Sequence, residues 1–280
     1  MSWFRFVFIG LVLFLFSVNG VSARSSASII AFDQITQPNQ PVRLAVRLVT
    51  GGLSLVHRPI SGERIEFMLK NRSLGQTLSG GDGVAEIRFV PPTPGLYVVR
   101  VRIVESPRYE ADAAVLNVAC RNASAPILFV ALSSVRIPSE PPSIPFNPTP
   151  SSDAMPEAVK VLSGLSKRYQ LLFIETGDEA LIPETKDWLI QQDFPPAPLY
   201  VWSMPNEAER RTERIVERLE EIRDAGWTNL SAWITRSTED AEALSNLKIK
   251  AVVMAEEDDN VPLEGSKKIT DWKSVPSVLK

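Results

Sequence analysis

Hydrophobic and polar residues alternate with a period of two through the first half of the chain, from about Ile29 to Cys120. In Val42–Leu48 the apolar side chains share one face and two arginines lie on the other, as in a half-buried β-strand. The same period recurs in Ile65–Leu69, Ala85–Phe89 and Tyr97–Ile103. Turns rich in Gly and Pro, at residues 80–83 and 91–95, separate these runs. The pattern predicts an antiparallel β-sandwich over residues 28–121.

The second half of the chain changes to apolar runs that alternate with amphipathic stretches. Strands are expected at Ile127–Ser133, Tyr169–Glu175, Leu199–Trp202, Leu230–Thr235 and Ile249–Met254. Helices are expected at Met155–Ser166, Pro183–Gln192, Asn206–Ala225 and Glu239–Leu247, the longest with an apolar stripe at Ile215, Leu219 and Ile222. Alternating strands and helices predict an α/β domain with a mainly parallel sheet over residues 125–258.

Three segments lie outside this regular pattern. Residues 1–23 have a basic Arg5, an apolar run at Phe6–Phe16 and small residues at Val21–Ala23, which predicts a cleaved signal peptide. An uncleaved N-terminal anchor is the alternative. The Pro-rich insertion 138–156 is expected to be a disordered surface loop or a flap over the sheet, and residues 261–280 a loose C-terminal tail. Apart from residues 1–23, no stretch is apolar enough for a transmembrane span, so the protein is predicted to be secreted, periplasmic or associated with the cell envelope.

Charge and residue counts exclude several classes of function. The 280 residues carry a net charge of -3 with mixed signs, which gives no reason to expect nucleic acid as a partner. Cys120 is the only cysteine, so no disulfide forms within the chain. His57 is the only histidine and lies in an expected loop. A hydrolase that uses a Ser-His-Asp or Cys-His system is therefore excluded.

Motifs in the first half resemble those of bacterial immunoglobulin-like domains. The stretch Gly62–Phe67 is followed by Leu74-Gly75, by the turn Gly81–Ala85 and by the strand entry Pro94–Tyr97. Their order is similar to the G-x-x-V-x-F, L-G, D-G-x-A and P-G-x-Y order of those domains. The resemblance implies an immunoglobulin-like sandwich, a fold that serves as spacer, adhesion module or packing partner.

Motifs in the second half resemble the haloacid dehalogenase-like (HAD) superfamily, in the branch of lipin-type and actin-patch phosphatidate phosphatases. Leu171–Gly177 is similar to the family's strand that ends in Ser or Thr, and Phe194-Pro195 to its entry into the next strand. Ala232–Leu244 is similar to the later segment G-N-R-x-T-D-x-x-A-Y. The resemblance implies a Rossmann-like α/β fold and a magnesium-dependent phosphohydrolase. Its D-x-D motif at the end of the first strand would supply a nucleophile, an acid/base and metal ligands.

The chain departs from this pattern at the positions that carry the chemistry. The two aspartates are replaced by Ala131 and Ser133. Alanine has no nucleophile or metal ligand, and a serine hydroxyl binds magnesium weakly without neighbouring carboxylates. The family's lysine has Arg210 or Arg211 as its nearest counterpart, and its loop Gly-Asn becomes Thr235-Arg236, whose fixed positive charge opposes metal binding. We therefore expect no catalytic residue and no resident metal.

Some residues in the family's positions keep the ability to bind an anion. The candidates are Thr176, Arg210, Arg211 and Arg236. Thr176 would otherwise cap local backbone. Asp240 matches the family's remaining acid, or it is a favourable charge at a helix start. The run Glu256–Asp259 is a replacement metal site or, as charge runs usually are, a solvated surface.

These observations predict an exported, non-catalytic HAD-like protein, a pseudo-phosphatase that acts as a binding or structural module at the cell envelope. Its partner would be an unknown protein or an anionic ligand, with no cofactor. A divergent phosphohydrolase that uses magnesium and acids such as Asp178 or Asp240 is one alternative. An adhesion protein whose functional part is the immunoglobulin-like sandwich is another.

Overall fold

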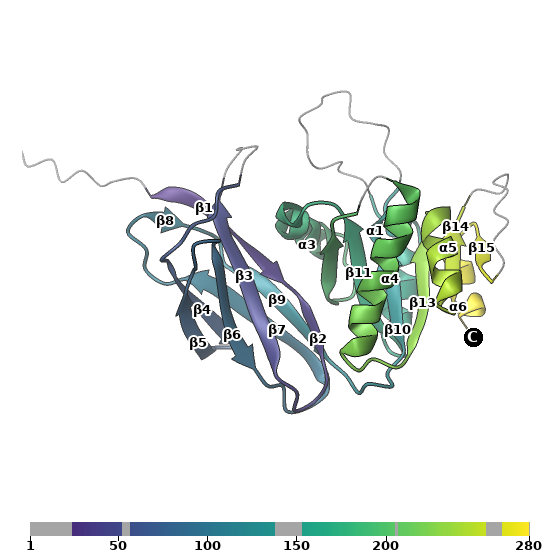
Figure 1. Cartoon of the computed structure of the whole chain (residues 1–280), viewed down its shortest axis with the longest axis horizontal. Coiled ribbons are helices and arrows are strands. Elements are labelled where there is room, and N and C mark those ends of the chain that lie inside the picture. The colour runs from purple at the N-terminus through teal and green to yellow at the C-terminus, as the bar shows by residue number, and fades with distance from the viewer. Residues whose placement is uncertain (1–23, 52–56, 138–152, 205–206, 256–264, 280) are drawn as a thin grey trace, which may run out of the picture.

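The computed structural model describes residues 24–51, 57–137, 153–204, 207–255 and 265–279. In these ranges the N-terminal half forms a β-sandwich and the C-terminal half forms a separate α/β unit beside it (Figure 1). The expected signal peptide, residues 138–152 of the Pro-rich insertion and the acidic run Glu256–Asp259 lie outside the described residues. None of the helices in the described ranges has both the length and the apolar character that crossing a bilayer requires.

The sandwich consists of two facing sheets. Its strands are β1 (Ser25–Phe32), β2 (Gln34–Thr36), β3 (Val42–Thr50), β4 (Arg64–Leu69), β5 (Arg72–Leu78), β6 (Val84–Phe89), β7 (Gly95–Ile103), β8 (Tyr109–Glu110) and β9 (Ala114–Cys120). One sheet has the order β6-β3-β1-β8 and the other β2-β9-β7-β4-β5. Strands β1, β3 and β6 correspond to A, B and E of the immunoglobulin fold, and β4, β7 and β9 to C, F and G. The sandwich is therefore immunoglobulin-like, as the sequence motifs predicted.

The core of the sandwich comes from the alternating apolar positions. Leu44, Val46 and Leu48 of β3 face Phe67 and Leu116 of the other sheet, and none of the five is exposed to solvent. Because successive side chains of a strand point to opposite faces, the intervening arginines of β3 point away from this core. The period-two prediction for this half is confirmed.

The α/β unit is built on a six-stranded parallel sheet in the order β12-β11-β10-β13-β14-β15. Its strands are β10 (Ile127–Ala131), β11 (Gln170–Thr176), β12 (Leu199–Trp202), β13 (Leu230–Thr235), β14 (Lys250–Met254) and β15 (Lys267–Ile269). Its α-helices are α1 (Leu132–Val135), α2 (Ala158–Leu165), α3 (Ile182–Gln191), α4 (Ala208–Asp224), α5 (Thr238–Asn246) and α6 (Val275–Val278), and its 3-10 helices are Glu179–Leu181 and Trp272–Ser274. With the strands numbered from β10, the order is 3-2-1-4-5-6, which occurs in doubly wound sheets.

Both faces of the parallel sheet are buried under helices. On one face α2, α3 and the C-terminal helices contribute to a core around Leu128, Val130 and Phe173. On the other face α4 and α5 cover a core around Phe129 and Trp233. The predicted stripe of Ile215, Leu219 and Ile222 packs into this second core. The strands and helices expected for this half are present, with ends shifted by a few residues.

The C-terminal segment differs from the loose tail that we expected from Val261. Residues 267–269 form β15, which pairs with β14 and extends the sheet. Trp272 is 1% exposed, packs into the core that faces α2 and donates an Nε1 hydrogen bond of 3.1 Å to the Ser134 carbonyl. The segment has too few apolar residues for a sequence period, yet Trp272 alone buries a large apolar area.

Replacing Trp272 with alanine is expected to destabilise the protein by about 3–5 kcal/mol, because a large cavity opens beneath the sheet. Urea unfolding followed by circular dichroism measures this loss. Trp272→Phe, which keeps most of the volume, should cost less than half as much. A Trp272→Ala variant with unchanged stability would show that this segment is not part of the folded core.

Candidate functional site

In doubly wound sheets ligands bind at the carboxyl ends of the strands, at the point where the strand order reverses. Here that point lies between β10 and β13, which pair in parallel although they are far apart in the sequence. Ala131 ends β10 and Thr235 ends β13. The topology therefore places most residues singled out from the sequence near one edge of the sheet.

The end of β10 carries no acidic side chain. Ala131 is the last strand residue, and the chain then turns into α1, so Ser133 lies on a helical turn and is exposed. Ser134 is fully buried, and its hydroxyl donates a 2.6 Å hydrogen bond to the Ala131 carbonyl. The strand ends two residues earlier than predicted, because Ser134 closes the backbone turn.

Asp240 is held by three neighbours at the end of β13. Its side chain is 4% exposed, and its Oδ1 accepts a 2.9 Å hydrogen bond from Arg211 Nε. Its Oδ2 accepts a 2.9 Å bond from the Thr235 hydroxyl. The backbone N–H of Asp240 donates to Ser237 Oγ, which caps α5. Both carboxylate oxygens are therefore occupied, and the charge is neutralised by Arg211.

Glu239, in the first turn of α5, has a lowered pKa. The Ser237 hydroxyl lies 2.7 Å from Glu239 Oε2, and this hydrogen bond holds the pKa of the carboxyl below its usual value. Acidic groups in the first turn are favoured because the helix N-terminus carries partial positive charge. Glu239 is exposed and stabilises the helix start.

A second ion pair lies beside the end of β11. Arg136 Nη1 is 2.6 Å from Glu175 Oε2, and the guanidinium lies 4.7 Å from the ring centroid of Trp188. The carboxylate and guanidinium are partly buried, at 14% and 27% exposure. Glu175 is thus paired with a fixed cation rather than left to bind a ligand.

The cavity beside Asp240 is small. A cavity of about 30 Å³ is lined by Ala131, Ser133, Ile174, Glu175, Thr176, Met204, Arg211, Ile215, Trp233 and Asp240. Such a volume is enough for about one water molecule. A phosphoester does not fit without movement of the surrounding side chains.

The structure brings together only some of the residues that were predicted to lie at the strand-end site. Thr176, Arg211 and Asp240 share the cavity with Ala131 and Ser133. Arg210 is on the exposed side of α4, with a side chain 70% exposed and 3.9 Å from Glu207. Arg236 is directed elsewhere, with Nη2 3.2 Å from the sulfur of Met155. Arg210 and Arg236 therefore do not join Thr176 in one anion site.

The residues at this edge do not fit a magnesium ion. Within the described ranges, no group of three or more Asp, Glu, His or Cys side chains is arranged to hold a metal. Magnesium is usually bound through one or two carboxylates together with waters and substrate oxygens. The two carboxylates that line this cavity, Asp240 and Glu175, are already neutralised by Arg211 and Arg136, and these fixed positive charges oppose a cation at this point.

The junction between the sandwich and the α/β unit contains a buried ion pair that the sequence did not reveal. Asp33 lies between β1 and β2, and its side chain is fully buried. Its carboxylate accepts hydrogen bonds from Asn117 N at 2.7 Å, Leu199 N at 2.9 Å and Lys186 Nζ at 2.6 Å. One carboxylate thus joins β9 of the sandwich to α3 and β12.

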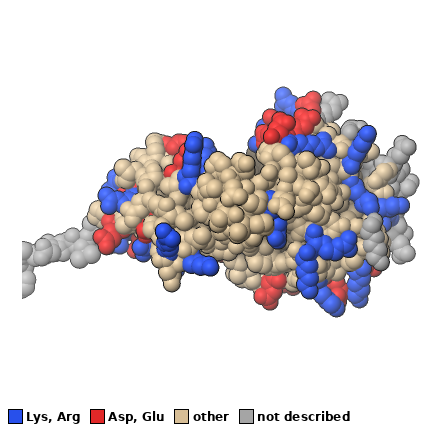
Figure 2. Space-filling model, turned by 90° about the horizontal axis from the view of Figure 1, so that it is seen from below, with Lys and Arg blue, Asp and Glu red and all other residues tan. Residues whose placement is uncertain are grey.

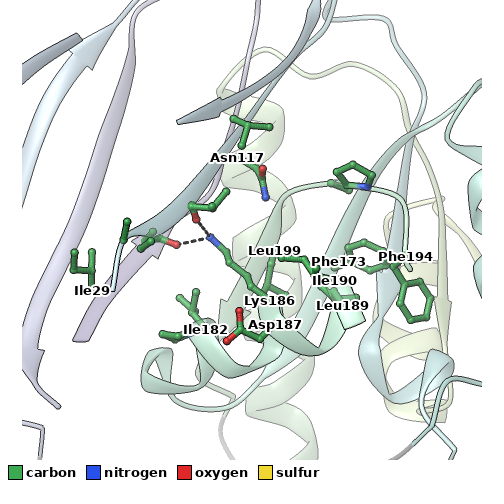
Figure 3. A pocket seen from close by; sticks show the side chains of 18 of the residues that line it. Ile29, Asn117, Phe173, Ile182, Lys186, Asp187, Leu189, Ile190, Phe194 and Leu199 are labelled. Carbon is green, nitrogen blue, oxygen red and sulfur yellow. Dashed lines mark hydrogen bonds between the residues drawn. The ribbon is translucent and has the colours of Figure 1, made fainter. Parts of the chain in front are cut away.

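Lys186 completes this network from the other side. Its ammonium also donates to the carbonyls of Ala31 and Val115, both at 2.8 Å (Figure 3). The three donors of the ammonium are therefore all used. Around the pair, Ile30 and Val49 of the sandwich belong to the core that contains Phe173 and Ile182. Two apolar residues of the sandwich therefore belong to a core of the α/β unit, while the rest of the sandwich has a core of its own.

Polar side chains extend the junction. Arg47 of the sandwich pairs with Glu179, and Arg121 Nε donates to Gln170 Oε1 at 3.3 Å.

Desolvation raises the pKa of the Tyr200 hydroxyl well above its usual value. On the face shown in Figure 2, the surface between the two lobes carries mostly uncharged atoms.

Next to Lys186, the sandwich and the α/β unit enclose a cleft of about 670 Å³. Its walls come from β1, β9 and the residues before it, α3 and the segment 193–197 (Figure 3). This is a large enough space for a small molecule or a short peptide segment. The cleft is much larger than the cavity at the strand ends.

Two weak sequence signals could have pointed to this junction. Lys186 falls on the same helical stripe as Ile182 and Leu189, because positions three and four apart share a face. Asp33 directly follows the apolar run Ile29–Phe32. A charge at a core position implies a buried partner, but the sequence does not say that these two pair with each other.

Comparison with known proteins gives limited information. No protein-family model matches the chain, and no curated protein matches it. Among solved structures, the CARDB domain of the PF1109 protein from Pyrococcus furiosus is 12% identical over 34% of this chain and 90% of that one, with a TM-score of 0.24. The PKD domain of human KIAA0319 is 18% identical over 37% and 88%, with a TM-score of 0.23.

A third similar structure spans both units. A family 123 glycoside hydrolase from Clostridium perfringens is 10% identical over 85% of this chain and 61% of that one, with a TM-score of 0.22. These scores are too low to support any conclusion about activity. The function therefore has to be argued from the residues of the chain itself.

Proposed function

We propose that the α/β unit is a HAD-like domain of the lipin type that has lost phosphotransfer chemistry. In this proposal the protein is a non-catalytic binding or structural module of the cell envelope. The resemblance of Leu171–Gly177 and Ala232–Leu244 to the family supports the HAD assignment. The strand order, with β10 in the centre of the sheet, is compatible with it.

One observation carries the non-catalytic part of the proposal: the two acids that line the crevice among the described residues, Asp240 and Glu175, are each already paired with an arginine. Asp240 accepts hydrogen bonds from Arg211 and Thr235 in a site with room for about one water. A nucleophile or general base needs a free oxygen within reach of the substrate. Ala131 supplies none, and both carboxylates that share the cavity with Ser133 are paired with arginines.

The envelope location rests on the predicted signal peptide, which lies outside the described residues. For an exported chain without disulfides, stability has to come from burial. The shared core around Ile30 and the Asp33–Lys186 pair fit that requirement. The two units are proposed to work as one rigid module.

Turnover of an aryl phosphate monoester by purified protein in the presence of magnesium tests the proposal. We expect no hydrolysis beyond that of magnesium in buffer, and the same result for Asp240→Asn. Hydrolysis by the natural protein that disappears in Asp240→Asn would refute the proposal and support the divergent phosphohydrolase. Hydrolysis that survives in Asp240→Asn and recurs in independently purified protein would also refute the non-catalytic assignment.

A further inference from the structure

The cleft beside Lys186 has an apolar lining that is open to solvent. Val98 of β7 and Ile190 of α3 both line it, and they are 47% and 66% exposed. Pro195 is half-buried at the same cleft, and Phe173 and Phe194 lie behind this surface, at 1% and 7% exposure. Exposed large apolar side chains that gather around one hollow are typical of an interaction site, whereas scattered ones are ordinary.

The sandwich wall of the cleft contains a strand edge that is not paired. Ile29 of β1 is opposite Leu48 of β3. The N–H of Leu48 donates to the Gly83 carbonyl, and its carbonyl accepts from the Ile60 N–H, so both peptide groups point away from β1. Ile29 and Leu48 are therefore a non-hydrogen-bonded pair, and the peptide groups of Ile29 point away from β3 as well.

Ala31, two residues further along β1, confirms that these peptide groups point into the cleft. Residues two apart in a strand direct their peptide groups to the same side, and the Ala31 carbonyl accepts its hydrogen bond from Lys186 across the cleft. Ala27, Ile29 and Ala31 all line the cleft. Outside the strand pairings, no backbone hydrogen bond of the described residues involves the peptide groups of Ile29.

The charge around the cleft is negative. Asp112, Asp187 and Asp193 line it and are exposed. None of these three carboxylates forms an ion pair within the described residues. The one cation among the lining residues is Lys186, whose charge is used by the buried Asp33. A ligand in the cleft thus meets an apolar floor, a free strand edge and three unpaired acids.

We propose that this cleft binds an extended basic segment of a partner protein, which adds to the free edge of β1 as a further strand. Strand addition gives affinity through backbone hydrogen bonds, and specificity comes from the side chains that alternate along the added strand. Apolar side chains of the segment contact Ile190 and Phe194, and its Lys or Arg side chains reach the three aspartates. The Ala31 carbonyl already accepts a hydrogen bond from Lys186, so the added strand cannot pair with β1 beyond this point.

This inference deepens the proposed binding function and rests on it. The two can fail separately, because phosphoester turnover is measured at the strand-end crevice and peptide binding at the junction. Absence of peptide binding leaves the non-catalytic assignment standing. Phosphoester turnover leaves the measured peptide affinity standing.

Fluorescence anisotropy with a labelled peptide of alternating lysine and valine tests the proposal. The full exported chain should bind this peptide and not a peptide of alternating glutamate and valine. In Asp112→Asn/Asp187→Asn/Asp193→Asn, affinity should fall about tenfold, since each exposed charge pair contributes little alone and three are removed together. A matched control removes three exposed acids of α4, with Glu213→Gln/Glu220→Gln/Asp224→Asn, and should bind as the natural protein does.

Hydrogen exchange at the Ile29 amide locates the bound peptide. Exchange should slow when the peptide is present, because the Ile29 N–H then gains a partner. The proposal is overturned by any of four results: no binding, equal binding of both peptides, equal loss in both triple variants, or binding without protection of Ile29. Protection of Ile29 by self-association, detected by sedimentation without peptide, would assign the cleft to a second copy and also overturn it.

Discussion

Replacing Lys186 with methionine is expected to destabilise the protein by about 3–5 kcal/mol, because it leaves the Asp33 carboxylate buried without its cation. The carbonyls of Ala31 and Val115 also lose their donor. Urea unfolding followed by tryptophan fluorescence measures the loss. Since Ile30 and Val49 of the sandwich pack into a core of the α/β unit beside this ion pair, the natural protein should unfold in a single transition, and the variant should do so at lower urea.

Two controls separate the ion pair from a general effect of charge removal. Lys160→Met removes a lysine that is 84% exposed, and its effect should stay within about 0.5 kcal/mol. Asp33→Asn/Lys186→Met removes both charges and should recover part of the loss, because no uncompensated charge remains. A Lys186→Met variant as stable as the natural protein would show that the pair does not hold the junction.

Replacing Arg211 with methionine is expected to cost a similar amount, about 3–5 kcal/mol, because the Asp240 carboxylate would be left buried with only the Thr235 hydroxyl as side-chain donor. Thermal or urea unfolding gives the change. The neighbouring Arg210→Met is the matched control. Its side chain is mostly exposed, so we expect less than about 0.5 kcal/mol.

The Arg211 variant also tests what the pair does. If Arg211 and Asp240 only stabilise the fold, Asp240→Asn/Arg211→Met should be more stable than Arg211→Met and equally inactive on phosphoesters. If the pair is the remnant of a working site, the free Asp240 of Arg211→Met should produce magnesium-dependent turnover. We expect the first result, because no second carboxylate with a free oxygen lies near Asp240 in the described ranges.

Most of the fold was predictable from the sequence because its cores follow strong periods. The period of two in Val42–Leu48 and the helical stripe of Ile215, Leu219 and Ile222 both correspond to observed core positions. The C-terminal strand and Trp272 were missed. A three-residue strand with two lysines has no detectable period, and it is held in place by its pairing with β14 and by the burial of Ile269.

The candidate site was predictable only in part. Strand ends can be placed from the sequence, and this brought Ala131, Thr176 and Asp240 to one edge of the sheet. The sequence alone did not show which of the two adjacent arginines faces the sheet, because this depends on how α4 is rotated about its axis. In the structure Arg211 pairs with the buried Asp240, and Arg210 is exposed. The junction pair Asp33–Lys186 joins residues far apart in the sequence, and no local pattern specifies such a contact.

In the proposed function, the strand-end crevice is filled by the ion pair of Arg211 and Asp240 and does not bind a phosphate group with magnesium. Ligand-induced stabilisation tests it most directly, because a ligand that binds the native state raises the unfolding temperature. A site filled at about one hundred times its Kd would contribute about 2.7 kcal/mol, or about 5–10 °C for a chain of this size.

The measurement is the unfolding temperature of the exported chain in magnesium chloride with and without inorganic phosphate, at concentrations up to about 10 mM, beside Asp240→Asn. If the crevice binds no phosphate, magnesium and phosphate together should change the unfolding temperature by less than about 1 °C in both proteins. A rise of several degrees in the natural protein that is absent from Asp240→Asn would contradict this proposal.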